Sequence, residues 1–425
     1  MIAERARPAR AEAEQRRALR HHVRREICAY SAWWRQRLAD AGVSAKAVRG
    51  PADLARLEPI GMLDADPAGL LLRPDPSSII SGGSRGLAWR FRLARLVGAT
   101  KRVTRSRVEL DFKPIHWLVE AGVPIGCSAS DLERLAELGR RWLDASGLRQ
   151  QDAMVSVLGA TPTLGFWELN LGARLAGLPL AAVGPKVDVE GVVRLGPTVL
   201  VGAAPELIGV LETWRPTPED GVHTLLVLGR RRLDPATRKR LEALVPAAAV
   251  LEAWAPAGCR SLWFQCRGGE GLHTEPGVEF LEAVDEAGLP LPAGQEGEIL
   301  WTSVGWRGSV FIRLRTGVRG RLTPMAPCPK CGRTSPRVLL EPAPPDLGVV
   351  LDRQPTVAAW QLELRPVNQA TQVVVYLAAV PGADLGELLS ILDADLEAAQ
   401  YVVLAEDELR ARIGRCGGSL VLDRT

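Results

Sequence analysis

The chain has 425 residues, of which 47% are hydrophobic and 24% are charged, and this balance is typical of a folded globular protein and not of a disordered one. Its length exceeds that of one ordinary domain and predicts a large domain with a smaller companion. The formal net charge of +4 arises from 53 basic and 49 acidic residues, which argues against nucleic acid as the main partner.

The N-terminal residues 4–26 are rich in Ala, Arg and Glu and predict a basic helix. They lack the apolar centre of a secretory signal, and no stretch of the chain reaches the roughly 20 apolar residues of a membrane span. Seven cysteines, an odd number, are typical of a reducing compartment. We therefore expect a cytoplasmic protein without membrane contact. A second basic run, residues 90–107, is either a solvated helix face or a patch for RNA or an acidic partner.

Short apolar runs alternate with amphipathic helical stretches between about residues 140 and 260, a pattern that predicts parallel strands linked by helical crossovers. The expected strands are residues 153–160, 178–184, 197–203 and 224–229, and the expected helices are 163–177, 204–214 and 234–245. From Trp254 onward, Gly-rich turns between strands predict antiparallel β structure.

A proline-rich segment, residues 341–348, predicts a hinge. The strand and helix patterns that follow predict a small α+β domain over residues 349–425, which leaves residues 1–340 as the large domain.

Five blocks of this sequence resemble, in order and spacing, the phenylacetate-CoA ligase family of the adenylate-forming (acyl-CoA synthetase) superfamily. They are residues 30–60, 192–212, 291–303, 313–317 and 328–333. The resemblance covers about residues 30–340. It implies an α/β fold: a large N-terminal domain of parallel sheets wrapped by helices, with an antiparallel β region, and a small α+β C-terminal domain.

The resemblance also implies a reaction. A carboxylate, here expected to be aromatic, is joined to AMP with release of pyrophosphate, and the acyl group then passes to coenzyme A or a carrier thiol. Phe166 and Trp167 are candidates for lining an acyl pocket, although aromatic residues on a helix more often belong to the core.

Three cysteines and a histidine have the spacing of metal ligands. Cys266 and His273 are followed, about 55 residues later, by Cys328 and Cys331 in a C-x-x-C. Three thiolates and an imidazole complete a closed tetrahedral zinc site, and a site without an open position is structural. The alternative is buried free thiols beside a surface histidine.

The family's phosphate loop corresponds here to residues 78–89. Ser81, Gly82, Gly83, Ser84, Arg85 and Gly86 are the candidates for holding a phosphate. The threonine pair and the Lys-Pro of the family pattern are absent, and the alternative is an ordinary Gly-rich turn.

Other nucleotide motifs are altered. Trp254 is a candidate for stacking on adenine, but Ala257 and Gly258 stand where the family has Thr and a Mg²⁺-binding Glu, and Glu252 is a possible substitute. At the adenine turn only Gly229 is kept, because three arginines follow it.

The ribose-binding block keeps Arg315 and Thr316, whereas Val318 replaces its aspartate; a valine cannot accept a hydrogen bond from a ribose hydroxyl. The C-terminal lysine that offsets charge in the family is also missing, with Arg412 and Arg415 as the nearest cations. No residue is assigned a catalytic role.

These departures leave two main hypotheses. Either the chain is a divergent enzyme that still uses ATP and Mg²⁺ to activate a carboxylate, or it is an inactive homologue that binds a ligand or a partner protein. A third hypothesis is an RNA-binding zinc-ribbon protein. The sequence argues against it, because there is only one C-x-x-C and no basic face with interleaved aromatic residues.

Overall fold

The computed structural model describes residues 7–44, 48, 50–62, 64–81, 85–98, 108–120, 123–158, 163–183, 189–229, 232–341, 351, 354, 356–367, 370–395, 400–415 and 421–423. The chain divides into two compact units. The large unit contains Met1–Arg232 and Glu242–Glu341, and the small unit contains Leu233–Leu241 and Pro342–Thr425. Among the described helices, none is both long enough and apolar enough to cross a membrane.

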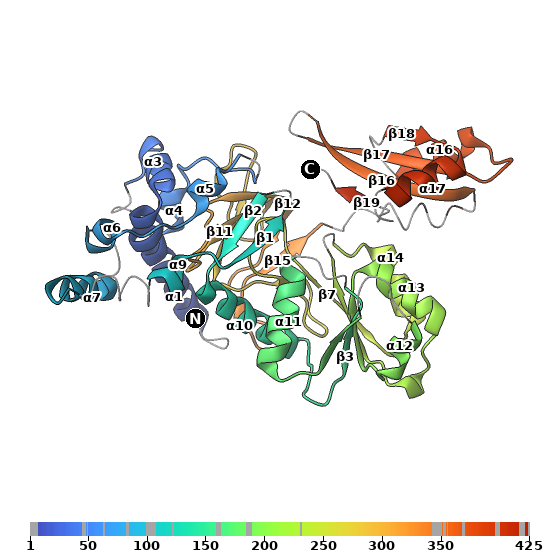
Figure 1. Cartoon of the computed structure of the whole chain (residues 1–425), viewed down its shortest axis with the longest axis horizontal. Helices are drawn as coiled ribbons and strands as arrows, with labels where there is room; N and C mark the ends of the chain where they lie inside the picture. Colours follow the sequence, from blue (N-terminus) through green and yellow to red (C-terminus); the bar gives the residue numbers. More distant parts are fainter. Residues whose placement is uncertain are drawn as a thin grey trace. The chain divides into compact units, whose positions relative to one another are not determined.

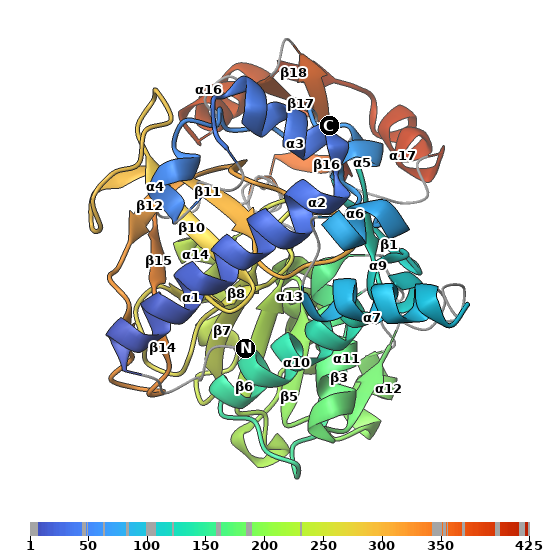
Figure 2. The same cartoon turned by 90° about the vertical axis from the view of Figure 1, so that its left-hand side faces the viewer.

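The large unit begins with the predicted basic helix. α1 (Pro8–His22) continues through a π-helical turn (Val23–Ile27) into α2 (Cys28–Tyr30), and α3 (Ala32–Asp40) follows. Proline in the first turn of α1 costs no hydrogen bond, because that N–H lacks an intrahelical partner anyway. Ala11, Gln15, Leu19 and His22 recur at helical spacing and form its buried face. Figure 2 shows α1 running across this side of the unit.

Short elements connect α3 to the central sheet. These are α4 (Pro51–Leu54), α5 (Pro67–Leu70), α6 (Pro76–Ser81), α7 (Arg85–Leu96), α9 (Leu110–Phe112) and the hairpin of β1 (His116–Glu120) and β2 (Val123–Cys127). α10 (Ala129–Ala145) comes next, and it is closed at its start by a capping box between Ser128 and Asp131.

The predicted parallel strands are present. β3 (Met154–Ser156), β4 (Leu180–Ala182), β5 (Val199–Gly202), β6 (Thr224–Leu228) and β7 (Ala249–Trp254) pair in parallel in the order 4-3-5-6-7. The connecting helices are α11 (Leu164–Ala176), α12 (Val189–Arg194), α13 (Ala204–Trp214) and α14 (Pro235–Leu244), with a 3-10 turn at Pro218–Asp220. Figure 1 shows α10 and α11 on one face of these strands and α12 and α13 on the other. β3, β5 and β6 are buried throughout, as strands covered on both faces should be.

The antiparallel region continues the same sheet. β8 (Trp263–Phe264), β9 (Leu272–His273), β10 (Glu279–Val284), β11 (Glu296–Ser303), β12 (Leu314–Leu322) and β15 (Arg337–Leu340) extend it to eleven strands in the order 10-11-12-15-9-8-7-6-5-3-4. The junction is the antiparallel pairing of Ala253 and Trp254 in β7 with Phe264 and Trp263 in β8. A separate two-stranded ribbon, β13 (Ala326–Pro327) and β14 (Thr334–Ser335), stands beside it.

The small unit contains a four-stranded sheet in the order 18-17-16-19, made by β16 (Val357–Val367), β17 (Ala370–Ala379), β18 (Gln400–Val403) and β19 (Val421–Asp423). Two helices, α16 (Leu385–Asp395) and α17 (Glu406–Arg415), complete it. Leu362, Val375, Leu377 and Leu388 form a buried cluster. The α+β composition agrees with the prediction for the C-terminal residues, whereas residues 342–348 of the predicted hinge lie outside the described residues.

Candidate metal centre and nucleotide-binding positions

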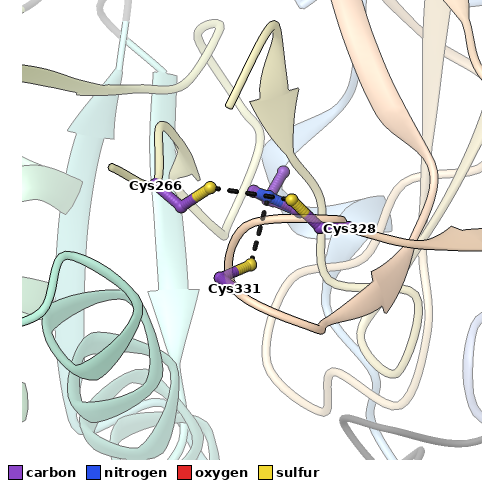
Figure 3. A group of neighbouring side chains, drawn as sticks. Cys266, Cys328 and Cys331 are labelled. Carbon is purple, nitrogen blue, oxygen red and sulfur yellow. Dashed lines mark hydrogen bonds between the residues drawn. The ribbon is translucent and has the colours of Figure 1, made fainter. Parts of the chain in front are cut away.

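Two turns bring the four predicted metal ligands together. Cys266 follows β8 and His273 ends β9, while Cys328 and Cys331 lie in the turn between β13 and β14. Their ligand atoms all lie within 4.8 Å of one another, and three of the four residues are buried. Figure 3 shows the three thiols pointing toward a common centre. The cluster is therefore a candidate metal site, as the spacing in the sequence predicts.

The spacing of the ligand atoms fits tetrahedral zinc. Bonds of about 2.3 Å to sulfur and 2.0–2.1 Å to nitrogen place two thiolates about 3.8 Å apart, and a thiolate about 3.6 Å from an imidazole nitrogen. The distance from Cys266 Sγ to Cys328 Sγ is 3.8 Å. The distance from Cys331 Sγ to His273 Nε2 is 3.5 Å. A disulfide would require sulfurs about 2.05 Å apart, so all three cysteines are free thiols.

The imidazole of His273 is oriented by its surroundings. Its Nδ1 lies 3.1 Å from Ser335 Oγ, and its ring stacks on Phe264 with centroids 5.5 Å apart. With the Nδ1 proton donated to Ser335, the Nε2 lone pair faces the thiols. A hydrogen bond to the distal nitrogen is the usual way in which proteins fix the tautomer of a metal-binding histidine.

The thiols of the cluster perturb each other. Hydrogen bonding from Cys266 and His273 lowers the pKa of Cys331 to about 3, while the same contact with Cys331 and burial raise the pKa of Cys266. One thiol thus holds its charge while its neighbour keeps a proton. A divalent cation removes this conflict, since it stabilises every thiolate at once.

Each of the two turns that carry the cysteines contains a glycine close to the sulfur atoms. A Cβ on Gly269 would lie 2.7 Å from Cys266 Sγ and 3.8 Å from Cys328 Sγ. Gly332, directly after Cys331, has φ +73° and donates its N–H to Cys328 O at 2.9 Å. Both positions need a residue without a side chain.

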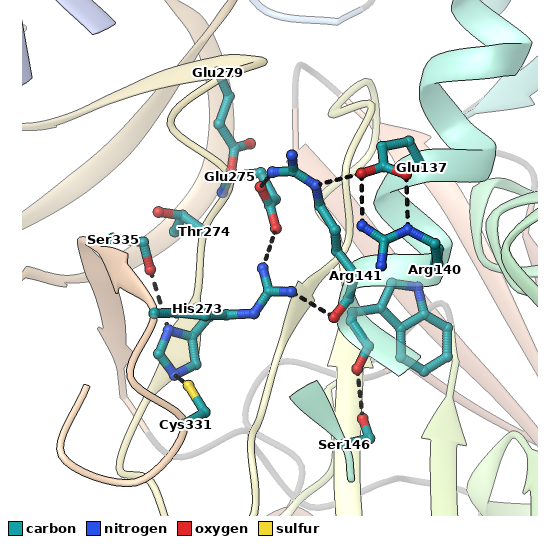
Figure 4. Close-up of polar contacts among 12 residues, drawn as sticks. Glu137, Arg140, Arg141, Ser146, His273, Thr274, Glu275, Glu279, Cys331 and Ser335 are labelled. Atoms are coloured by element: carbon teal, nitrogen blue, oxygen red, sulfur yellow. Dashed lines mark hydrogen bonds and ion pairs between the residues drawn. The ribbon is translucent and has the colours of Figure 1, made fainter. Parts of the chain in front are cut away.

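A buried network of arginine and glutamate ties the cluster to α10 (Figure 4). Arg333 donates to Glu275 Oε1 at 3.0 Å and to Arg141 O at 2.6 Å, and Arg141 donates to Glu275 Oε2 at 3.2 Å. Arg141 also reaches Glu137 at 3.1 Å. Because Arg333 and Glu275 lie two residues from Cys331 and His273, the metal ligands are held on rigid backbone.

The predicted phosphate loop is set apart from the other nucleotide candidates. Ser81 ends α6, Arg85 and Gly86 begin α7, and Gly82, Gly83 and Ser84 lie outside the described residues. Figures 1 and 2 both place α7 away from β7, which ends at Trp254. The described residues on either side of Gly82–Ser84 are helical, and the phosphate-binding role of the loop stays a prediction.

Trp254 ends a strand at the carboxyl edge of the parallel sheet, where ligands of α/β proteins usually bind, and Gly229 directly follows the neighbouring strand β6. Trp254 itself is buried and packs edge-on against Trp263 at 5.9 Å. Four residues later Gly258 has φ +85°, and a Cβ there would lie 2.7 Å from Leu314 Cδ2 and 2.8 Å from Met62 Sδ. Gly258 stands at the position that corresponds to the family's Mg²⁺-binding Glu, and its positive φ disfavours any residue with a side chain there.

Glu252 does not point to solvent as a substitute Mg²⁺ ligand. It is 2% exposed, and its Oε1 lies 3.6 Å from Arg232 Nε. Metal binding here would have to displace this arginine.

The polar side chains of the Arg-x-Arg-Thr-Gly block form hydrogen bonds and ion pairs with other residues of the large unit. Arg313 is 1% exposed and donates to Glu282 Oε2 at 3.3 Å and to the carbonyls of Ala55, Leu57 and Gly288. Arg315 forms an ion pair with Glu298 on β11, and the Thr316 hydroxyl donates to Ile299 O.

Arg412, a candidate replacement for the family's C-terminal lysine, is bonded to other side chains of the small unit. Arg412 donates to Gln361 at 2.8 Å and to Glu363 at 2.6 Å, and it stacks over Tyr376. The side chain of Arg415 lies outside the described residues.

Two buried polar groups escaped sequence reasoning. Arg260 is fully buried, lies 3.3 Å from Asp131 Oδ2 and stacks over Trp306 at 4.2 Å. Glu279 is 1% exposed and accepts from Ser261, Trp263, Trp301 and the backbone N–H of Glu275. Their partners are far apart in the chain, so no local pattern announces them; the one available signal was a charged residue inside an apolar run.

No protein-family model matches the chain, and no curated protein matches it. Solved structures do. A 2-hydroxyisobutyryl-CoA ligase in the postadenylation state, in complex with R3-HIB-AMP, is 14% identical with a TM-score of 0.65, over 97% of this chain and 92% of that one. The same ligase with 2-HIB-AMP and CoA in the thioesterification state is 14% identical with a TM-score of 0.64, over 98% of this chain and 94% of that one.

The chain has the fold of the adenylate-forming acyl-CoA ligases. Both the large α/β part and the small C-terminal part of that fold are covered. At 14% identity the likeness concerns the fold alone.

Proposed function

We propose that this chain is a phenylacetate-CoA ligase-like protein in which Mg²⁺- and ATP-dependent activation of a carboxylate is lost or much reduced. Its scaffold would serve to bind an acyl ligand or a partner protein. The observation that carries the proposal is Gly258, whose φ of +85° disfavours any residue with a side chain, so that no carboxylate stands at this position.

The missing carboxylate at residue 258 matters because Mg²⁺ binds through carboxylate oxygens and substrate phosphates. A neighbouring acidic residue could bind Mg²⁺ in place of the family's Glu, which is Gly258 in this chain. Here the nearest candidate, Glu252, is buried beside Arg232. Without the ion, the charge of the triphosphate is not offset during transfer.

The ribose and acyl positions support the same proposal. Val318 offers no acceptor, and burying a hydroxyl without a partner costs about 1–3 kcal/mol. Arg315 and Thr316 are bonded to Glu298 and Ile299. Trp167, a candidate for the acyl pocket, packs against His116 at 4.3 Å and against Phe166 at 5.6 Å, so its ring is engaged within the protein.

For the Cys₃His cluster we propose a structural zinc ion held by Cys266, His273, Cys328 and Cys331. The support is the agreement of the 3.8 Å and 3.5 Å separations with tetrahedral edges and the orientation of His273 by Ser335. Four protein ligands leave no position for a substrate. By analogy with the bound states of the structural neighbours, an acyl compound and coenzyme A or a carrier thiol are the ligands to test.

The deciding experiment measures pyrophosphate release by the purified chain with ATP, Mg²⁺ and a library of aromatic and aliphatic carboxylates. We expect no release, or release far slower than the roughly 1–1,000 turnovers per second that are typical of enzymes. Turnover within that range with any acid, abolished by Arg315→Ala, would refute the proposal and favour the divergent enzyme.

A gain-of-function variant sharpens the test. Val318→Asp restores an acceptor for the ribose hydroxyls, so AMP binding measured by calorimetry should strengthen about tenfold, the equivalent of one hydrogen bond of about 1.4 kcal/mol. Pyrophosphate release should not increase, because residue 258 of this variant still provides no carboxylate for Mg²⁺. Val318→Ala is the control, and it should bind AMP no better than the native chain.

A further inference from the structure

A cavity of about 580 Å³ lies within the large unit, and neither the four candidate metal ligands nor the predicted nucleotide residues line it. Its walls come from α1, α4 and the residue after it (Ala52 and Ala55), strand β10, the hairpin at Pro290–Ala293 and the end of β12. The volume is within the range of about 300–1,000 Å³ that small-molecule sites occupy. No role described above uses this cavity.

The walls are mostly apolar and well anchored. Phe280, Leu281, Leu291, Leu322 and Met325 are among the lining residues. Gln15 on α1 donates to Glu279 O on β10 at 2.9 Å, which fixes the helix against the edge strand of the sheet. Figure 2 shows α1 crossing in front of this part of the unit. The cavity is thus formed by elements already held in place.

The charge of the lining has one sign. Glu12, Glu279 and Glu282 line the cavity, and none of the described lining residues is Lys, Arg or His, although the protein as a whole carries a net charge of +4. Glu12 stands at the helix surface and forms an ion pair with Arg16 at 3.1 Å, while Glu282 is 5% exposed.

One carboxylate oxygen of Glu282 is buried without a hydrogen-bond donor among the described residues. Its Oε2 accepts from Arg313 Nε at 3.3 Å, but its buried Oε1 has no hydrogen-bond partner within the described part of the chain. Burial raises the pKa of Glu282, against the lowering effect of Arg313. A buried carboxylate oxygen without a donor is costly, and a ligand that supplies a donor removes that cost.

We propose that this cavity binds a small organic cation, an apolar aryl or alkyl body that carries one primary ammonium group, with the ammonium donating to Glu282 Oε1. The apolar walls take the body. The ammonium is favoured over a hydroxyl because a hydrogen bond between two charged groups is roughly twice as strong as one between neutral groups. An anion is disfavoured beside the carboxylates of Glu12 and Glu282.

Phenethylammonium is a suitable probe, with phenethyl alcohol as its neutral counterpart and phenylacetate as its anionic one. Calorimetric titration of the full-length chain at pH 7 should show binding of the ammonium compound. The alcohol should bind at least fivefold more weakly. Equal affinity for the alcohol would remove the assigned role of Glu282, and absence of ammonium binding would overturn the proposal.

Variants that fill the cavity locate the site without touching its carboxylate. Ala52→Trp and Ala293→Trp place an indole at exposed positions of the lining, and each should weaken phenethylammonium binding at least tenfold. Ala39→Trp, at an exposed position of α3 outside the lining, is the matched control and should bind as the native chain does.

Glu282→Gln keeps an acceptor for Arg313 and removes the charge, so it should abolish the preference for the ammonium compound over the alcohol. Native-like binding in both tryptophan variants would place the ligand elsewhere and refute the assignment. Because the probes need neither ATP nor Mg²⁺, failure here leaves the proposal on ligase activity untouched.

Discussion

Single residues determine whether the metal cluster is complete. Cys266, His273, Cys328 and Cys331 were all predicted from their spacing, and the structure brings their ligand atoms within 4.8 Å of one another. The identity of the ion stays a prediction. It can be tested on individual ligands, because removing one from a closed tetrahedral site leaves three donors around a poorly held ion.

We expect Cys328→Ala to lower the bound zinc from about one equivalent to a small fraction and to reduce the temperature of unfolding, because folding of such a site is coupled to metal binding. Elemental analysis and thermal denaturation, with and without chelator, measure both effects. Lys330→Ala changes the same turn without removing a ligand and should keep zinc and stability. Full stability of metal-free protein would contradict a structural role.

Glu279 makes stability depend on pH. Burial raises its pKa to about 7, above the value near 4.3 that an unfolded glutamate has. The folded state therefore holds a proton that the unfolded state has released, so the contribution of Glu279 to stability is present below about pH 4.3 and is lost as the pH rises through 7.

Urea unfolding of the native chain at pH 5.5 and pH 8 should accordingly show a smaller contribution from this residue at pH 8. Glu279→Gln cannot titrate. It should be less stable overall, because its amide NH₂ meets the donors that now surround the carboxylate, yet it should show a smaller difference between the two pH values. A variant with the same pH dependence as the native chain would assign the effect to another group.

At the scale of elements, close packing of α10 on α11 depends on two glycines. A Cβ on Gly139 would lie 2.0 Å from Glu168 O, and one on Gly172 would lie 2.4 Å from Gly139 C. The sequence predicts both helices by their periodicity, but it does not show that their backbones touch. Only the folded arrangement reveals why these positions have no side chain.

Gly172→Ala should lower the free energy of unfolding by about 1–3 kcal/mol, the usual range for overpacking, because backbone atoms cannot move aside as a flexible side chain can. Gly209→Ala on α13 is the control. Its Cβ would meet nothing within 4 Å, and alanine favours a helix over glycine by up to about 1 kcal/mol, so this variant should be slightly more stable. Equal destabilisation by both variants would exclude the packing explanation.

At the scale of the whole molecule, we propose that residues 1–340 and 349–425 are separate domains joined by the proline-rich segment 341–348. Brief digestion with a protease that cleaves after glutamate should cut first at Glu341, because exposed linkers are preferred sites of cleavage. Mass spectrometry of the fragments identifies the first cut. A first cut after Glu387 or Glu406, on the helices of the small unit, would contradict the proposed boundary.

The sequence by itself determined the pattern of the parallel strands, the α+β character of the C-terminal part and the four candidate metal ligands. Each of these depends on hydrophobic period or on the chemistry of particular residue types, and both are written locally in the chain. Val318, at the position where the resembled family has its ribose-binding aspartate, is visible in the same way.

Tertiary structure alone decided the remainder. It joined the parallel and antiparallel regions into one sheet through β7 and β8, placed Leu314 and Met62 against Gly258, and made Glu282 part of the lining of a cavity beside α1. These features arise where segments distant in sequence meet, and the cost of a side chain or an unpaired oxygen there depends on neighbours that no local pattern specifies.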